Sequence, residues 1–408
     1  MIGRILRQAR QRLRTLHTWR GLSLLIRARL HSDPRRHNLL FIIPWMVVGG
    51  ADKVNLDLAT HLDKTVFSLH FLTTSPAENL WATQFARVSP NILHLPELVR
   101  PDSYERFIVS YIRLARIRTV LISNSLVGYR VAEAIKRHYP LVKVLDLLHG
   151  EGGQHEGGGF PYLSLPFEHL LDHRIVVTQY LKDLLVRKYH LDPCRITVVH
   201  NGIASSSVAG AKVEHGRYRK ALGLEADDFV VTYIGRFAPE KHPEHVVAIA
   251  DILIRQQQLA RVHFVLAGDG PLRPEIERAI RRSPLLERCV HLTGYIRDPG
   301  RLILDSDVLV LTSEAEGLPL VVLEAMSLGV PVIASEVGGL PEIITHQRDG
   351  YLVPWSAHLV SDVALIIRTL VYDELTRHSL RVEARLKIQA AFSLERMIRG
   401  YERILLAE

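Results

Sequence analysis

The sequence predicts an α/β protein built from two Rossmann-like domains, each a doubly wound parallel sheet, that face each other across a cleft. From residue 38 onward, short apolar runs alternate with helical patterns, which is typical of stacked βαβ units. The chain has 408 residues, more than a single hydrophobic core usually organises, so two domains of roughly 200 residues each are expected. Its composition, 47% hydrophobic and 23% charged, is that of an ordinary globular protein.

The expected strands fall into two sets. The first domain, 38–204, has runs at 39–43, 66–72, 91–95, 119–122, 142–148, 174–177 and 196–199. The second, 205–391, has runs at 229–234, 262–267, 290–293, 308–311, 331–334 and 350–353. Helices are expected between them, among them 52–62 and 243–255, and a last helix at 394–406. The weakly patterned stretch 204–226 is the expected connection between the domains.

Positive charge is concentrated at the N-terminus. Residues 1–37 hold ten Arg and one acid, a net of +9, whereas residues 38–408 hold 41 basic and 42 acidic groups, a net of −1. Apolar residues recur at helical spacing among the arginines of 2–16, which predicts a basic amphipathic helix lying on an anionic membrane surface. We therefore expect a cytoplasmic protein held peripherally at the membrane, with a helix packed on the body or an arm touching nucleic acid as alternatives.

Two further observations limit the partners and the compartment. Trp19 is the one aromatic residue among the arginines, so stacking on bases is poorly provided and the sequence argues against nucleic acid. Cys194 and Cys289 fall in different halves of the chain, which favours a reducing compartment without a disulfide framework.

The run Glu314-Ala315-Glu316-Gly317-Leu318-Pro319 follows the strand 308–311 and opens a helix, with Pro319 expected in its first turn. A helix N-terminus there directs free N–H groups into the crevice where parallel sheets bind anions. Glu316 is expected at the mouth of this site and Glu324 about two turns down one face of the helix. Two carboxylates beside a phosphate site suit a phosphorylated, hydroxyl-rich ligand, although a pair of solvated helix charges is the alternative.

Other loops at the strand ends add candidate groups. Gly49 and Gly50 follow the first strand, where glycine lets the backbone approach a ligand; they do not form the dinucleotide fingerprint, which argues against a dehydrogenase. Arg236 and Lys241 follow the strand 229–234 and can neutralise two phosphates. The alternatives are a plain turn for the glycines and solvated loop charges for the cations.

A glycine-rich loop, 149–159, begins with His149 after the strand 142–148 and can close over an acceptor through Glu151, Gly152 and Gly153. Its spacing does not fit a zinc site. Asp305-Ser306-Asp307 superficially matches an Asp-x-Asp metal motif, but we interpret Asp307 as capping the start of a strand. We expect no metal site and no cofactor.

Together these segments resemble the retaining glycosyltransferases of family 4, which have the GT-B fold. The matching motifs are Gly235-Arg236 with Lys241, Gly268-Asp269-Gly270-Pro271, and the Glu-x7-Glu motif from Glu316 to Glu324. The resemblance implies catalytic roles for Glu316, His149, Arg236 and Lys241. It also implies donor and nucleotide contacts by Gly49, Gly50, Gly235, Gly268, Gly270, Tyr295, Ile296, Gly317, Leu318, Pro319 and Glu324. In this fold the last helix, about 392–408, returns to pack on the first domain.

The expected function is therefore transfer of a sugar from a nucleoside diphosphate sugar to a saccharide or lipid-linked acceptor, as in the synthesis of surface polysaccharide or lipopolysaccharide. The resemblance implies retention of anomeric configuration and no need for a metal ion. Two alternatives stay open: a nucleotide-sugar epimerase of the same architecture, and a non-catalytic protein that binds a membrane or nucleic acid.

Overall fold

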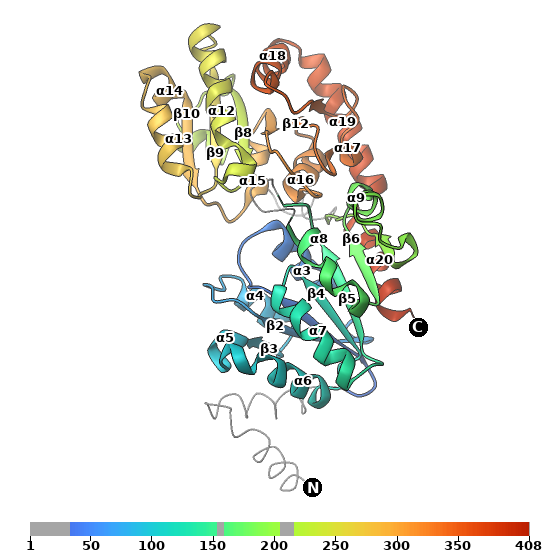
Figure 1. Ribbon diagram of the computed structural model, residues 1–408. Coiled ribbons are helices and arrows are strands. Elements are labelled where there is room, and N and C mark those ends of the chain that lie inside the picture. Colours follow the sequence, from blue (N-terminus) through green and yellow to red (C-terminus); the bar gives the residue numbers. More distant parts are fainter. Residues whose placement is uncertain (1–32, 153–158, 205–215, 408) are drawn as a thin grey trace.

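A computed structural model describes residues 33–152, 159–204 and 216–407 and shows two α/β domains stacked one above the other (Figure 1). Each domain is a fully parallel sheet flanked by helices, so the predicted fold class is confirmed. The amphipathic segment predicted within residues 1–37 lies almost wholly outside the described residues. Over the described residues, no helix combines the length and the apolarity that a membrane crossing requires.

The first sheet has seven strands and reverses its winding between β1 and β4. Across the sheet the strands are β3 (Ile92–His94), β2 (Phe67–Thr73), β1 (His37–Ile43), β4 (Thr119–Ser123), β5 (Lys143–Leu148), β6 (His173–Val176) and β7 (Ile196–Val198). Residues 39–43 of β1 are completely buried, as a central strand covered on both faces requires. In such sheets the crevice for a ligand opens at the carboxyl ends of the strands beside the reversal.

The second sheet has six strands and reverses between β8 and β11. Its strands in spatial order are β10 (Val290–Gly294), β9 (Val262–Ala267), β8 (Phe229–Ile234), β11 (Val308–Leu311), β12 (Val332–Ser335) and β13 (Tyr351–Val353). The loop after β8 carries Arg236 and Lys241, and the loop after β11 carries Glu316. The reversal therefore brings these two predicted motifs to adjacent places at one sheet edge.

Helices and short turns connect the strands. Those of the first domain are α3 (Gly50–His61), α4 (Ala82–Val88), α5 (Leu95–Leu98), α6 (Tyr104–Leu114), α7 (Leu126–His138), α8 (Gly159–Leu163) and α9 (Gln179–Tyr189). The second domain has α11 (Arg217–Ala221), α12 (Pro243–Ala250), α13 (Arg273–Ile280), α14 (Pro284–Cys289), α15 (Pro299–Leu304), α16 (Leu320–Leu328), α17 (Leu340–Ile343), α18 (Leu359–Tyr372) and α19 (Glu374–Ala391). Short 3-10 turns lie at Pro101–Ser103, Leu165–Leu170, Pro193–Arg195 and Pro239–Lys241.

Three boundaries differ from the sequence prediction. The strand expected at 91–95 ends at His94, because Leu95 opens α5 with Pro96 in its first turn. The helix expected at 243–255 is α12 to Ala250, continued by a π-helical turn, Asp251–Gln256. Pro319 is the residue before α16, in extended conformation, and not part of its first turn.

The last helix, α20 (Leu394–Leu406), lies against the first domain, beside β6 and α9 in Figure 1. Glu402 accepts a hydrogen bond from the Asp63 backbone N–H at 3.2 Å, and a side chain at Gly400 would press on Val199. Just before α20, Ile203 donates to the Phe392 carbonyl at 3.0 Å and accepts from the Leu394 N–H at 2.9 Å. The segments at 203 and 392–394 are thus paired like neighbouring strands.

A buried ion pair lies in the first domain. Arg174 on β6 is 1% exposed, and its Nη1 contacts Asp146 on β5, which has no exposed surface. Tyr129 donates to Asp146 Oδ1 at 2.6 Å, and Arg174 Nε donates to Glu168 Oε2 at 2.7 Å. Burial raises the pKa of Asp146 to about 6, whereas the positive charge of Arg174 acts to lower it.

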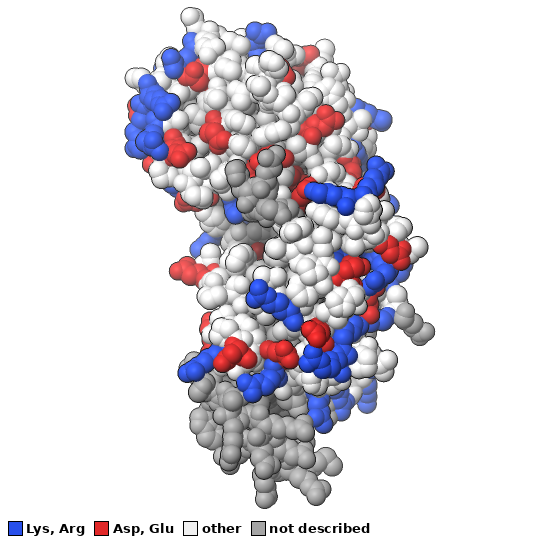
Figure 2. Space-filling view, in the orientation of Figure 1, with Lys and Arg blue, Asp and Glu red and all other residues white. Residues whose placement is uncertain are grey.

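On the outer surface, basic and acidic side chains intermingle over the face that Figure 2 shows.

Candidate active site

Glu316 and Lys241, predicted from separate motifs, form an ion pair at the carboxyl edge of the second sheet. Lys241 Nζ lies 2.7 Å from Glu316 Oε1, and Ser313 Oγ donates to the same oxygen at 2.6 Å. Glu316 is only 9% exposed, so the pair lies in a partly desolvated place where charges act strongly. The structure thus brings together one carboxylate and one ammonium directly before the start of α16.

Arg236, the other predicted cation, is held less firmly. Its Nη2 lies 2.6 Å from Glu240 Oε1, but its side chain is 70% exposed. An exposed guanidinium keeps most of its donors for a ligand, and its forked geometry matches a phosphate. Arg236 lies just before the 3-10 turn that follows β8 and Lys241 is the last residue of that turn, so the same loop carries both cations.

The predicted glycines after β8 and β9 allow two loops to approach closely. Gly268 has φ of 153°, and a Cβ there would lie 1.9 Å from the Gly235 carbonyl oxygen. Gly270 has φ of 155° and would meet the Phe237 oxygen at 2.5 Å. Any side chain at either position would push these loops apart. Tyr295 and Ile296, predicted to lie by a nucleobase, follow β10 on the same side, with Tyr295 half exposed.

Gly317 lies where the backbones of the two domains approach closely. A Cβ on it would lie 1.8 Å from the His149 carbonyl oxygen, and a Cβ on Gly150 would lie 3.3 Å from Gly317 N. Leu318 is buried, and its carbonyl accepts from Asn201 Nδ2 of the first domain at 2.9 Å. The N-terminus of α16 is therefore fixed against the loop that begins at His149.

His149 lies at the end of β5, with Nε2 at 2.9 Å from Ser123 Oγ on β4. Its Nδ1 is buried and has no hydrogen-bond partner among the described residues. Desolvation lowers the pKa of His149 to about 4, so the ring is neutral at pH 7. The sequence placed His149 at the site, but it gave no signal for the contact with Ser123.

Gly49 and Gly50 open α3 on the first-domain side. Gly49 precedes the helix and Gly50 is its first residue, with nothing within 4 Å of a Cβ built on Gly50. Asp52 in the first turn is buried, and desolvation raises its pKa to about 7. The loop is thus open at Gly50, as close approach of a ligand requires, while the buried Asp52 carboxylate lies beside Gly49, with Oδ2 3.4 Å from a Cβ built there.

Glu324 is the fifth residue of α16, one turn inside the helix, and lies near α3 of the first domain. Desolvation raises its pKa to about 7, Lys53 opposes this rise, and Asp57 and Asp298 add to it. Lys53 itself pairs with Asp57 at 2.5 Å. A buried carboxylate in this setting is stabilised by a ligand whose hydroxyl groups donate hydrogen bonds to it.

The raised pKa makes stability depend on pH. The pKa of Glu324 rises from 4.5 to about 7 on folding, so the folded protein binds this proton more tightly than the unfolded chain does. The stability that this proton contributes is complete below pH 4.5 and is lost as the pH rises to 7. We expect Glu324→Gln to raise the free energy of unfolding at pH 8 by on the order of 2 kcal/mol, and by less at pH 5. Urea unfolding at both pH values measures this, with the exposed Glu275→Gln as control. An equal effect at both pH values would contradict it.

A contact that the sequence did not predict joins α9 to α17. Glu342 of the second domain accepts from the backbone N–H of Gln179 at 2.9 Å and of Tyr180 at 2.8 Å. Its Oε2 also lies 2.8 Å from His200 Nε2. These donors lower the pKa of Glu342 despite its burial. A carboxylate from one domain thus caps a helix of the other, which no local pattern can reveal.

The predicted acceptor loop is described only in part. Glu151 accepts a hydrogen bond from the Tyr180 hydroxyl at 2.6 Å, which places its carboxylate beside the start of α9. Gly152 lies against Gly159, which has φ of 60°. Gly153 lies outside the described residues.

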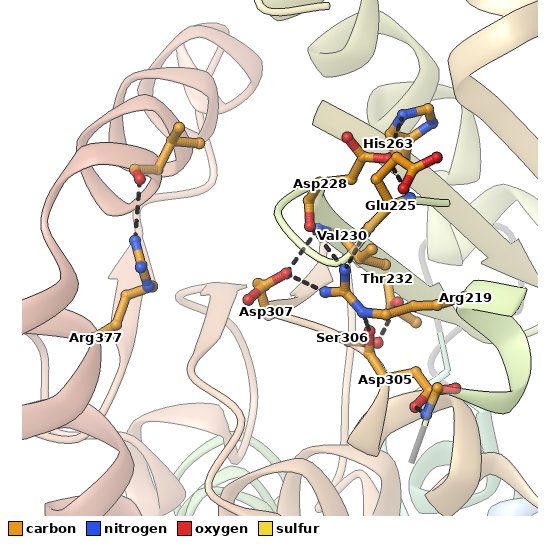
Figure 3. A network of polar contacts seen from close by, with 12 residues as sticks. Arg219, Glu225, Asp228, Val230, Thr232, His263, Asp305, Ser306, Asp307 and Arg377 are labelled. Atoms are coloured by element: carbon orange, nitrogen blue, oxygen red, sulfur yellow. Dashed lines mark hydrogen bonds and ion pairs between the residues drawn. The ribbon is translucent and has the colours of Figure 1, made fainter. Parts of the chain in front are cut away.

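Asp305 and Asp307 belong to a structural network (Figure 3). Asp307 Oδ2 accepts from Arg219 Nη2 at 2.7 Å and from the N–H of Val230, in β8, at 2.9 Å. Asp305 accepts from the Gly216 and Tyr218 backbone N–H groups at 2.5 and 2.7 Å and so caps α11. Both carboxylates are occupied by these donors, and Asp307 lies directly before β11, as interpreted from the sequence.

One group of described side chains has the composition of a metal site, and the sequence analysis missed it. His242, Glu244 and His245 have ligand atoms within 4.8 Å of one another. His242 Nδ1 is 2.6 Å from Glu244 Oε1, and the two imidazoles stack with centroids 4.7 Å apart. The spacing His-x-x-His at a helix start was the available signal.

Two family models match the chain: "Glycosyltransferase Family 4" over residues 48–206 and "Glycosyl transferases group 1" over residues 228–371. A UDP-Gal:alpha-D-GlcNAc-diphosphoundecaprenol alpha-1,3-galactosyltransferase of Escherichia coli is 29% identical over 53% of this chain and 55% of its own length. N-acetyl-alpha-D-glucosaminyl L-malate synthase of Bacillus anthracis is 27% identical over 88% of this chain and 93% of its own. The match thus spans about half of the first relative and nearly all of the second.

Solved structures share the fold. HepE of Anabaena, in complex with UDP-glucose, superposes with a TM-score of 0.75 at 19% identity, covering 90% of this chain and 99% of its own. The lipopolysaccharide outer core galactosyltransferase WaaB superposes with a TM-score of 0.66 at 16% identity, covering 90% and 98%. These likenesses confirm the predicted two-domain architecture.

Proposed function

Because this chain belongs to the glycosyltransferases of family 4, we propose that it transfers a sugar from a nucleoside diphosphate donor to a saccharide or lipid-linked acceptor. The observation that carries the proposal is the meeting of Lys241, Glu316 and the start of α16 at one sheet edge, directly opposite His149 of the other domain. Two domains thus contribute to one site, which suits a reaction between two large substrates.

The charges of the site suit departure of a diphosphate. Arg236, Lys241 and the backbone N–H groups before α16 stabilise the negative charge that develops as the bond from the sugar C1 to the diphosphate oxygen breaks. Glu316 accepts from hydroxyls of the donor sugar, and Glu324 from hydroxyls of the ribose. The nucleobase lies by Tyr295 and Ile296, and the diphosphate between the Gly49-Gly50 loop and the Gly235, Gly268 and Gly270 loops.

The acceptor oxygen bonds to C1 on the face from which the diphosphate leaves, so the anomeric configuration is retained. The electron pair of the broken bond leaves with the diphosphate, and the acceptor's proton passes to the departing phosphate oxygen. Side-chain cations and a helix N-terminus supply the positive charge in this scheme, so it needs neither a metal ion nor a cofactor.

For the acceptor, the Escherichia coli relative supports a lipid-linked saccharide, because its name specifies a diphosphoundecaprenol substrate. The UDP-glucose complex of HepE supports a uridine nucleotide as the first donor to try. The basic segment 1–37 would hold the enzyme at the cytoplasmic face of the membrane, near such acceptors. This combination supports a role in surface polysaccharide or lipopolysaccharide synthesis.

A screen of nucleoside diphosphate sugars by thermal shift tests the proposal, because a ligand that binds the folded state raises the unfolding temperature. One donor is expected to stabilise the native protein and not Glu324→Ala. Incubation of that donor with a lipid-linked saccharide should then release nucleoside diphosphate, with turnover reduced about 100-fold in Glu316→Gln. Conversion of the donor without any acceptor would indicate an epimerase, and no stabilisation by any donor would contradict the proposal.

A further inference from the structure

A buried series of polar side chains connects α3, through β4, to the imidazole of His149. Asn55 on α3 donates its Nδ2–H to Ser123 Oγ at 3.1 Å, and Ser123 Oγ lies 2.9 Å from His149 Nε2. Asn55 and Ser123 are 2% and 1% exposed, so bulk water does not compete for these contacts. The series joins the helix of the glycine loop to the histidine that faces Gly317.

The direction of these hydrogen bonds determines where the ring carries its proton. In the assigned amide orientation, which leaves Asn55 Oδ1 buried without a partner among the described residues, the Ser123 oxygen accepts from Asn55. The Ser123 O–H is then left to donate, and His149 Nε2 is the acceptor within reach. A ring nitrogen that accepts a hydrogen bond carries no proton, so the neutral ring has its proton on Nδ1. Nδ1 is the nitrogen that is buried without a partner among the described residues.

We propose that Asn55 and Ser123 are positioning residues that hold the neutral His149 ring with its proton on Nδ1, so that this N–H donates to a hydroxyl oxygen of the bound donor sugar. The inference rests on the proposed function, because the sugar is the ligand it completes. The carbonyl of His149 packs on Gly317, before α16, so its imidazole is anchored beside the place where the diphosphate and sugar meet. A buried donor without a partner is satisfied when a hydroxyl oxygen arrives.

Asn55→Asp tests the direction of the hydrogen bonds from Asn55 to His149, because a carboxylate has nearly the same shape as the amide but can only accept hydrogen bonds. Ser123 then donates to Asp, its oxygen accepts from His149 Nε2–H, and the ring proton moves to Nε2. Two-bond 1H–15N correlation spectra of the full chain labelled with 15N-histidine distinguish the tautomers, and His149→Gln identifies the signals. We expect the Nδ1–H form in the native protein, the Nε2–H form in Asn55→Asp, and a mixture of both in Ser123→Ala.

Steady-state kinetics of sugar transfer provide a second measurement. Asn55→Asp is expected to lower kcat for sugar transfer at least tenfold with less than a threefold change in the KM of the donor, and Ser123→Thr, which keeps the hydroxyl, is expected to retain activity that Ser123→Ala loses. An Nε2–H form in the native protein, or unchanged kcat in Asn55→Asp, would overturn the proposal. If Asn55→Asp fails to fold, the tautomer of His149 and the kcat of Ser123→Ala and Ser123→Thr test the same proposal.

The spectra need no substrate, so they separate this inference from the proposed function. Absence of transfer with every donor would contradict the proposed function. The tautomers in the native protein and in Asn55→Asp would still show whether Asn55 and Ser123 fix the ring proton.

Discussion

Replacing Gly317 with alanine is expected to reduce kcat/KM for sugar transfer by about 100-fold, although it adds one methyl group. The new Cβ would lie 1.8 Å from the His149 carbonyl oxygen, and both partners are backbone, so neither can rotate away. The second domain must move by an ångström or more relative to His149. A displacement of this size in a catalytic site costs about 10²-fold.

Gly300→Ala is the matched control for this substitution. Gly300 lies in α15 and takes no part in the contact between Gly317 and His149, and the nearest atom to its Cβ is Asp298 Oδ1 at 3.5 Å, an ordinary contact. Initial rates with saturating acceptor and varied donor give kcat/KM for both variants, and circular dichroism verifies that each is folded. If Gly317→Ala retained more than a third of native kcat/KM, the close approach of the two domains would have no part in catalysis.

Arg174→Leu is expected to lower the free energy of unfolding by about 3–5 kcal/mol, the largest change in stability that we predict. Removing the guanidinium leaves Asp146, which has no exposed surface, with Tyr129 as its remaining side-chain partner. A buried carboxylate without a counter-charge either stays ionised, at the free-energy cost of its desolvation, or takes up a proton. Urea unfolding followed by circular dichroism measures the loss.

Two further variants test whether the lost charge, and not the lost side-chain volume, lowers the free energy of unfolding in Arg174→Leu. Arg187→Leu, at a side chain 80% exposed, is expected to change stability by less than about 0.5 kcal/mol. The double variant Arg174→Met with Asp146→Asn removes both charges and is expected to recover more than half of the loss. A double variant no more stable than Arg174→Leu would mean that the loss comes from packing alone.

The sequence predicted the sheets well because their signal is local. Each buried strand is a run of apolar residues between turn-forming ones, and every run expected from 39–43 to 350–353 is a strand of the structure, within one or two residues at each end. The same local logic failed at Pro319, where a proline suited to a helix's first turn stands one position before it. Helix ends depend on contacts beyond the turn, here the packing of Gly317 on His149.

The site was predictable as a set of motifs but not as an arrangement. Glu316 and Lys241 were each recognisable from the loop that carries them, whereas their ion pair depends on the order of β8 and β11 in the sheet. Glu342 and Asn55 gave no signal, because an acid in a helix and an amide in another are usually solvated. Their roles arise only when residues distant in sequence, such as Gln179 and Ser123, are brought beside them.

The pairing of Ile203 with residues 392–394 has a mechanical consequence. Ile203 and residues 392–394 lie side by side and are hydrogen-bonded to each other, so a rotation of one domain relative to the other would pivot there. Rotation about one narrow hinge moves nearby groups little and distant groups far. A rotation about this pivot would keep Ile203 in register with residues 392–394 while it moves the outer parts of the two domains most.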